Sequence, residues 1–170
     1  MSFRCFFVTV FLLVLGSMVS GCKSSGPTRL CEGFESYQSV SAVRAELKRR
    51  GSISGWKEDS QGTDPADRRP PYKLIYLSGP FTASGIEGTL KFTFYNGRLM
   101  ETQFSTAQGA EFLSALRRQY SALPQKPAEE VLADRHTRLR FDPGPNGSLV
   151  FTWCDAALQK EWRDWVASNS

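Results

Sequence analysis

Residues 88–104, with the sequence GTLKFTFYNGRLMETQF, constrain the fold more than any other part of the chain. Two runs rich in Thr, Phe, Leu and Tyr flank Asn96 and Gly97, and an Asn-Gly pair in this setting is the strongest short-range signal for a β-hairpin. A two-residue turn would place Phe92 opposite Glu101 and put a charge on the apolar face. A three-residue loop with a bulge at Gly97 places Phe92 opposite Met100. We therefore expect this bulged hairpin, because it pairs apolar side chains with each other on the buried face.

Helix signals lie on both sides of this hairpin. Ser39 is a suitable N-cap for a helix that Gly51 would end, and Asp155 is a suitable N-cap for the last helix. A further helix is expected from Ser105. The other expected strands are residues 72–77, 137–141 and 149–153. Because sequential strands tend to pair antiparallel, we expect an α+β fold, an antiparallel β-sheet meander with about three helices packed on one face.

The first 22 residues have the organisation of a secretory signal. Arg4 precedes an apolar run from Cys5 to Val19, which is too short for a stable transmembrane helix. The run ends in the sequence Val-Ser-Gly-Cys at residues 19–22. In this segment the chain resembles bacterial lipoproteins, whose lipobox consists of an aliphatic residue, two small residues and a cysteine.

The resemblance implies that residues 1–21 are a lipoprotein signal peptide and that Cys22 is the lipidation site. The acyl chains on Cys22 would then hold the protein to the membrane, since two or three chains, at about 0.8 kcal/mol per buried CH₂, bind far more firmly than one. Lys23 stands where an aspartate retains enterobacterial lipoproteins in the inner membrane, which implies the outer membrane, facing the periplasm. The alternative is an ordinary secretory signal peptide followed by a chance cysteine.

The rest of the chain divides into a tether and one domain. Residues 22–30 have no apolar period and are expected to be a flexible tether. Residues 31–170 are long enough for a single α+β domain with its own core. Within it, residues 59–71 carry no apolar side chain larger than alanine apart from proline, so we expect a mobile loop, either a plain insertion or a functional loop.

Two cysteines remain in this domain, Cys31 and Cys154. In an oxidising compartment we expect them to form a disulfide that joins the beginning of the domain to its end. For a closed loop of roughly a hundred residues, the chain-entropy model gives about 4–5 kcal/mol of stabilisation. The alternative is a redox or metal pair, but the sequence has no C-x-x-C motif and a single histidine, His136.

The sequence lacks the motifs of well-known catalytic chemistry. It contains no G-x-S-x-G, H-E-x-x-H or Walker motif and no cluster of metal ligands, and we expect no metal and no cofactor. His136 lies beside Asp134 at the beginning of an expected strand, where an exposed polar residue is ordinary. The net charge of +4 is spread along the chain and its basic runs lie near expected helix ends, so we expect no nucleic-acid partner.

Trp162 and Trp165 lie three residues apart on one face of the last expected helix. They fit the core, and the alternative is a partner surface, because tryptophan is enriched at binding hot spots. We therefore expect a lipid-anchored, non-catalytic cell-envelope protein with a protein partner and a role in interaction or envelope assembly. One alternative is a periplasmic ligand-binding or inhibitor lipoprotein that uses residues 59–71 beside an aromatic pocket. Another is a hydrolase built on two carboxylates that the fold brings together.

Overall fold

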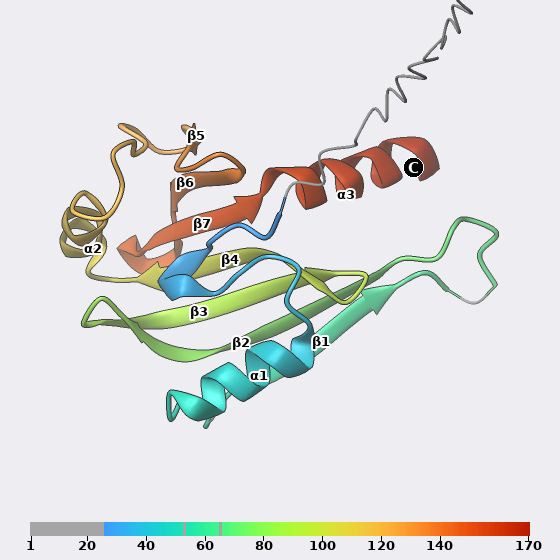
Figure 1. Ribbon diagram of the computed structural model, residues 1–170, viewed down its shortest axis with the longest axis horizontal. Helices are drawn as coiled ribbons and strands as arrows, with labels where there is room; N and C mark the ends of the chain where they lie inside the picture. Colours follow the sequence, from blue (N-terminus) through green and yellow to red (C-terminus); the bar gives the residue numbers. More distant parts are fainter. Residues whose placement is uncertain (1–25, 53, 65) are drawn as a thin grey trace, which may run out of the picture.

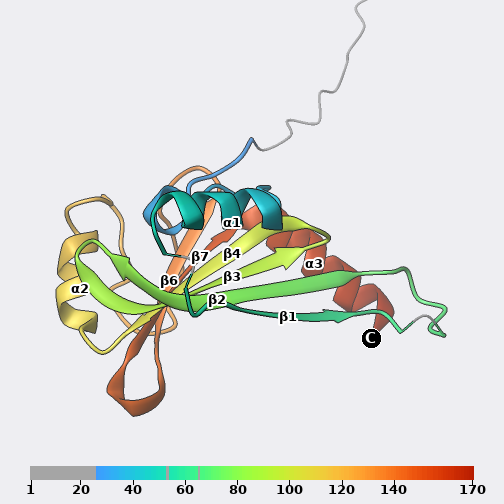
Figure 2. The same ribbon diagram turned by 90° about the horizontal axis from the view of Figure 1, so that it is seen from below.

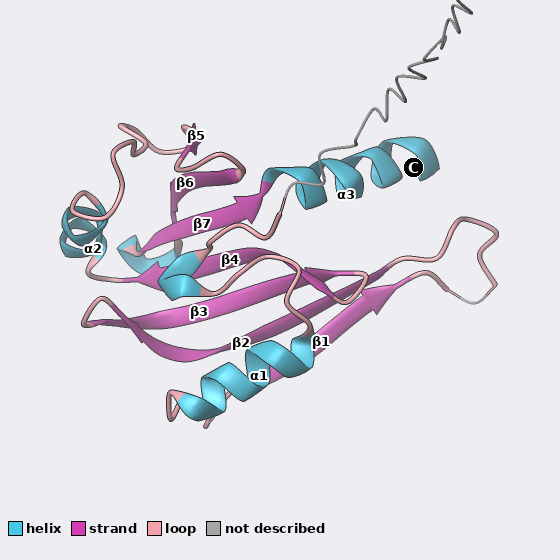
Figure 3. Cartoon of the chain, viewed as in Figure 1, coloured by secondary structure: helices cyan, strands magenta, loops and turns pink. Residues whose placement is uncertain are grey.

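A seven-stranded antiparallel sheet forms the centre of the protein in the computed structural model of the chain (Figure 1). The structure describes residues 26–52, 54–64 and 66–170. Strands make up most of the regular structure, and three α-helices surround them (Figure 3). In chain order the strands are β1 (Lys57–Gly62), β2 (Lys73–Ala83), β3 (Ile86–Tyr95), β4 (Arg98–Thr106), β5 (Val131–Leu132), β6 (Thr137–Pro143) and β7 (Leu149–Asp155).

The expected meander is wrong in its second half. The order across the sheet is β1-β2-β3-β4-β7-β6-β5, so β1 to β4 are sequential but β7 inserts beside β4. After β4 the chain passes through α2 (Gly109–Leu116), crosses to the far edge at β5 and returns through β6. Phe104 of β4 lies opposite Phe151 of β7, and both are buried. Burial of such large side chains outweighs the preference for pairing with the next strand in sequence.

The expectation that all helices pack on one face is also wrong. α1 (Val40–Arg49) and α2 contribute Val43, Leu47, Phe112 and Leu116 to the larger core cluster on one face of the sheet. α3 (Ala156–Asn169) packs on the opposite face, where Leu158 joins a smaller cluster that contains Leu74, Tyr95 and Met100. The sheet therefore has apolar side chains on both faces at the end that carries α3.

The central hairpin connects β3 to β4 with a shorter turn than expected. Tyr95 pairs with Arg98, so only Asn96 and Gly97 form the turn. Their φ angles are 49° and 79°, which is the left-handed backbone that a two-residue hairpin turn requires. The expected three-residue loop is therefore wrong.

With a two-residue turn, regular pairing would place Glu101 opposite Phe92 on the apolar face. A bulge further along β4 prevents this. Phe94 lies opposite Leu99, and Thr93 lies opposite Glu101, which leaves Met100 as the extra residue. A bulge redirects the side chains that follow it. Glu101 consequently lies on the face that carries α3, and the larger core cluster on the other face holds no carboxylate from this strand.

Two helix starts are confirmed and one is wrong. The Ser39 hydroxyl accepts a hydrogen bond from the Ala42 N–H at the beginning of α1, and the Asp155 carboxylate caps α3. α2 does not begin at Ser105, because Ser105 is still part of β4 and pairs with Thr89 and Val150. Pairing with a distant strand thus overrides the local helix signal.

The folded part of the chain begins at Thr28, before the expected boundary at Cys31. Leu30 and Phe34 are each 1% exposed and belong to the larger core cluster, next to the 3-10 turn η1 (Cys31–Gly33). The Tyr37 N–H donates to the Leu99 carbonyl oxygen at 2.9 Å, which joins this segment to β4. Residues 28–30 therefore pack as part of the domain, although the sequence assigns them to the tether.

The segment expected to be a mobile loop, residues 59–71, begins with four residues of strand, 59–62. β1 is an edge strand whose six residues are all exposed, and it pairs with β2 alone. The polar composition that suggested a loop also suits an edge strand, because charged side chains protect an exposed edge. Residues 63–72 form the connection, and its ends are joined by a hydrogen bond of 2.8 Å from the Tyr72 N–H to the Thr63 hydroxyl. In the described part of the chain, no helix is both long and apolar enough to span a bilayer.

Candidate functional site

The face of the sheet that carries α3 is only partly covered by that helix. Two rows of mostly polar side chains cross this face beside α3, with one residue from each of six strands. The first row is Asp59, Tyr76, Thr93, Glu101, Cys154 and Arg138. The second row is Lys57, Ser78, Lys91, Gln103, Thr152 and Arg140. We call these two rows the polar face.

A cavity of about 280 Å³ lies where the polar face meets α3, and we call it the α3 groove. Its lining combines apolar, aromatic, polar and charged side chains: Leu74, Tyr76, Lys91, Thr93, Met100, Glu101, Gln159, Trp162 and Arg163. Small-molecule sites usually measure about 300–1,000 Å³. The groove therefore suits a single ring, or one residue of a longer molecule.

Glu101 is the most unusual group in the groove. Burial raises the pKa of its carboxyl group, and the positive charges of Arg140 and Lys91 offset part of that effect. Its carboxylate accepts a hydrogen bond of 3.0 Å from Gln103 Nε2, but within the described residues it forms no ion pair with either cation. A half-buried carboxyl group with a raised pKa beside a cavity is typical of a functional site.

Three further polar side chains line the groove, Gln159, Lys91 and Arg163. Gln159 Oε1, on α3, is buried and accepts no hydrogen bond from the residues that the structure describes. A buried acceptor without a donor costs about 1–3 kcal/mol. Lys91 Nζ lies 4.6 Å from the centre of the Tyr76 ring, and neither Lys91 nor Arg163 forms a salt bridge within the described part of the chain.

The two tryptophans of α3 have different surroundings. Trp162 and Trp165 are both half-buried and stack at 5.5 Å with an angle of 6° between their planes. Trp162 lines the groove and packs against Tyr72 and Tyr95. Trp165 instead donates from Nε1 to the Pro70 carbonyl oxygen at 3.2 Å, which attaches α3 to the connection between β1 and β2. Figure 2 shows this connection and the C-terminal end of α3 on the same side of the molecule.

The expected disulfide between Cys31 and Cys154 is not formed, because both cysteines are free and buried. The Cys31 N–H donates to the Thr102 hydroxyl at 3.2 Å, and Thr102 lies opposite Trp153 in the sheet. Cys154, the next residue after Trp153, lies opposite Glu101 and points to the other face, since side chains alternate along a strand. The sheet therefore separates the two thiols.

Burial also makes both thiols poor nucleophiles. It raises the pKa of Cys31 well above its ordinary value, and burial together with the charge of Glu101 raises the pKa of Cys154 to about 12. Because the thiolate is the reactive form, neither cysteine is activated at neutral pH. Cys154 is part of the polar face but contributes no chemistry to it.

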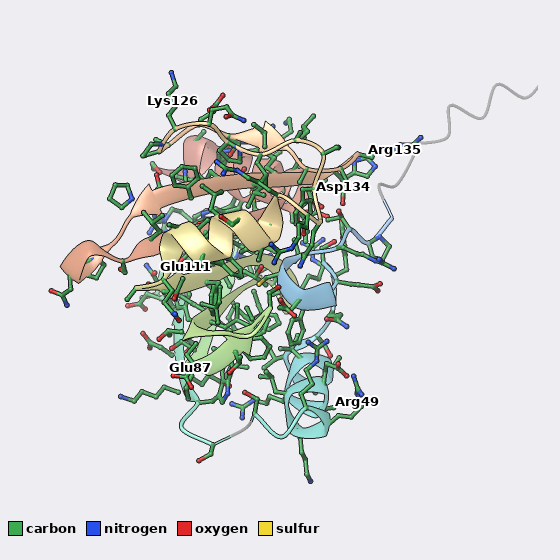
Figure 4. The ribbon with its side chains drawn as sticks, turned by 90° about the vertical axis from the view of Figure 1, so that its left-hand side faces the viewer. Arg49, Glu87, Glu111, Lys126, Asp134 and Arg135 are labelled. Atoms are coloured by element: carbon green, nitrogen blue, oxygen red, sulfur yellow. The ribbon has the colours of Figure 1, made fainter. Side chains whose placement is uncertain are left out.

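A network of hydroxyls and carboxylates joins the two ends of the domain where the disulfide was expected. The Thr28 N–H donates to the Ser36 hydroxyl at 2.9 Å, and that hydroxyl donates to Asp155 Oδ2 at 2.8 Å. The hydroxyls of Thr28 and Thr137 donate to the Asp134 carboxylate at 3.1 and 2.8 Å. We call these five residues the N-terminal latch. Figure 4 shows Asp134 beside the N-terminal segment.

Other candidate sites have less support. A hollow of about 410 Å³ is lined by residues that include Ser52, Pro80 and Glu87, and another of about 390 Å³ lies next to the latch. Among the residues that line them, neither contains a buried polar side-chain atom without a hydrogen-bond partner in the described part of the chain. His136 is half-buried at the beginning of β6, and no group of three metal-ligating side chains is placed to hold an ion in the described ranges. Cys22 lies outside the described residues.

The groove residues other than Trp162 were not singled out from the sequence. The hairpin register expected from the sequence does place Lys91 and Glu101 on one face, and the structure reaches the same arrangement through the bulge at Met100. Gln159 and Arg163 carry no comparable signal, because their role depends on the face of the sheet that α3 covers. Comparisons with protein-family models, curated proteins and solved structures find no match.

Proposed function

We propose that the protein is a lipid-anchored binding protein of the bacterial cell envelope, without catalytic activity of its own. Acyl chains on Cys22 would hold it to the outer membrane on the periplasmic side. The observation that supports binding is the α3 groove, where Trp162, Glu101 and Gln159 line one cavity. Desolvated polar groups that lack partners in the free protein are suited to contacts with a ligand.

The spacing of carboxylates supports binding rather than hydrolysis. Glycosidases hold their two carboxyl groups about 5–9.5 Å apart. Asp59 lies in the same row of the polar face as Glu101 but three strands away, which is about 14 Å at a strand spacing of about 4.8 Å. Tyr76 and Thr93 lie between them, so these two carboxylates do not act on one bond.

The surface supports a ligand in the groove more than a broad apolar contact with another protein. In the described part of the chain, Leu132 is the one large apolar side chain that is strongly exposed, at 59%. Protein-binding surfaces of the apolar kind are contiguous patches of several hundred Å².

A protein partner remains the second candidate because of β1. Its outer edge pairs with no strand among the described residues, and all six of its residues are exposed. A partner could add a strand there through main-chain hydrogen bonds. In the free protein the Ser60 N–H donates to Asp59 Oδ1 at 2.8 Å. Substitution of Ser60 by proline removes this N–H, and we expect it to weaken capture of a partner that binds along this edge.

The anchor is tested with the full precursor and a fatty-acid probe. Cys22→Ser removes the thiol that would form the thioether, so we expect the variant to keep its signal peptide and to lose labelling. Cys5→Ser is the matched control, because that cysteine lies inside the signal peptide and should leave labelling unchanged. Normal labelling and cleavage of Cys22→Ser would contradict the anchor.

Binding is tested by native mass spectrometry of the mature lipoprotein in detergent, after incubation with a soluble envelope extract. We expect the wild type and Arg135→Gln, an exposed substitution outside the groove, to retain the same additional mass. Lys91→Gln should lose it. We call a retained mass groove-dependent when the wild type keeps it and Lys91→Gln loses it. If no such mass is found, the proposed binding function is wrong.

A further inference from the structure

We infer that the ligand of the α3 groove is an acidic saccharide, a pyranose ring that carries a carboxylate. This inference rests on the proposed binding function and adds the chemical class of the ligand. Each part of such a molecule corresponds to one set of side chains in the groove.

The ring corresponds to the aromatic and apolar side chains. Tyr76 and Trp162 line the groove together with Leu74 and Met100. A pyranose presents C–H groups on its faces and hydroxyls at its rim, so its face can pack on an aromatic ring whose face is partly negative. The cavity of about 280 Å³ has room for one such ring, free or as one residue of a polymer.

The hydroxyls correspond to the unsatisfied acceptors. Gln159 and Glu101 both line the groove. Gln159 Oε1 accepts no hydrogen bond from the residues that the structure describes, and the half-buried Glu101 carboxylate accepts one from Gln103 Nε2. Hydroxyls at the rim of a sugar supply donors to both. A hydrocarbon chain would bury the Glu101 carboxylate without replacing the hydrogen bonds that it makes with water, which is unfavourable.

The carboxylate corresponds to the two cations. Lys91 and Arg163 line the groove, and neither is paired with a carboxylate in the described part of the chain. A negatively charged group in the groove would form charge-assisted hydrogen bonds with these side chains. Because Glu101 lines the same groove, a singly charged carboxylate is repelled less than a doubly charged phosphate.

The test compares matched sugars that differ in the acidic group. N-acetylmuramic acid is N-acetylglucosamine with an added lactyl carboxylate, and glucuronic acid is glucose with its C6 oxidised to a carboxylate. Binding to the mature lipoprotein in detergent is followed by tryptophan fluorescence and by calorimetry. We expect at least one acid to bind about tenfold more tightly than its neutral partner, which corresponds to about 1.4 kcal/mol. The pair that shows this preference distinguishes a lactyl from a uronic carboxylate.

The variants assign each contact. Arg163→Gln and Lys91→Gln should each remove most of the preference for the acid and leave the affinity for the neutral sugar unchanged. Gln159→Met should weaken both sugars about equally while the protein stays at least as stable to heat, because the variant loses an unsatisfied buried acceptor. Arg135→Gln, outside the groove, should change neither affinity.

Two results would overturn the inference. One is equal affinity for acidic and neutral sugars in the wild type, and the other is an acid preference that survives both Arg163→Gln and Lys91→Gln. If sugars fail but a groove-dependent mass is still retained from the envelope extract, the binding function stands and the saccharide assignment is wrong. If no groove-dependent mass is retained either, both proposals are wrong.

Discussion

The Ser36 hydroxyl donates a hydrogen bond of 2.8 Å to Asp155 Oδ2, although 119 positions separate the two residues in the chain. The other oxygen of this carboxylate accepts from the N–H groups of Ala157 and Leu158 and so caps α3. One fully buried carboxylate therefore both begins the last helix and holds the N-terminal segment. This contact fastens the two ends of the domain, as the expected disulfide between Cys31 and Cys154 would have done.

Removal of this carboxylate should destabilise the domain strongly. Asp155→Ala loses the cap of α3, worth about 1 kcal/mol, and the bond to Ser36, worth about 1.5–3 kcal/mol for a charged partner. We expect the free energy of unfolding in urea at neutral pH to fall by about 2–4 kcal/mol. Asp164→Ala is the control, because Asp164 pairs only with Lys160 on the exposed face of α3. Similar losses for the two variants would show that the latch contributes little.

The two cysteines should behave as buried, unpaired thiols. We expect iodoacetamide to modify neither Cys31 nor Cys154 in the native mature protein, because both are buried and their pKa values are raised. After unfolding without a reducing agent, mass spectrometry should find both alkylated. An unfolded, unreduced protein in which neither cysteine reacts would instead demonstrate the disulfide that the sequence suggests.

Glu101→Gln should stabilise the protein above acidic pH. The folded-state pKa of Glu101 is raised, so the folded protein binds more protons than the unfolded chain between its unfolded pKa, about 4.3, and its folded pKa. The wild type therefore loses stability as the pH rises through this window, and the variant does not. Urea unfolding at several pH values should show the difference growing from acidic to neutral pH. Glu87→Gln, an exposed change on β3, reports the effect of losing one negative charge alone.

Asp134 should have the opposite pH dependence. Burial alone would raise the pKa of its carboxyl group, but hydrogen bonds from the N–H groups of His136 and Thr137 and from two threonine hydroxyls bring it below the ordinary value. Its contribution to stability is then present above the unfolded pKa, about 3.9, and is lost as the pH falls through the folded pKa. Asp134→Asn should lower stability at neutral pH and make acid unfolding less steep. Unchanged unfolding curves from neutral to acidic pH would contradict this role.

The α3 groove shows why a site can be missed when its chemistry is visible in the sequence. The hairpin register expected from the sequence places Lys91 and Glu101 on the same face, but it does not show which residues cover that face. α3 was expected to share a face with α1 and α2, which would place Gln159 and Arg163 far from Glu101. The helix packs on the other face because Leu74, Tyr95 and Met100 provide an apolar surface for Leu158 there.

The sequence by itself determined the local features of the domain. The caps at Ser39 and Asp155 and the position of the hairpin turn at Asn96 and Gly97 depend on hydrogen bonds and φ angles within a few residues, so their signals are short-range. Only the tertiary structure decided that β7 lies beside β4, since strands distant in sequence pair through the large side chains that they bury together. It also decided the face of each residue after Met100, because one extra residue in a strand with a period of two exchanges its faces. That bulge directs Glu101 toward the α3 groove, and the alternation along β7 places Cys154 across the sheet from Cys31.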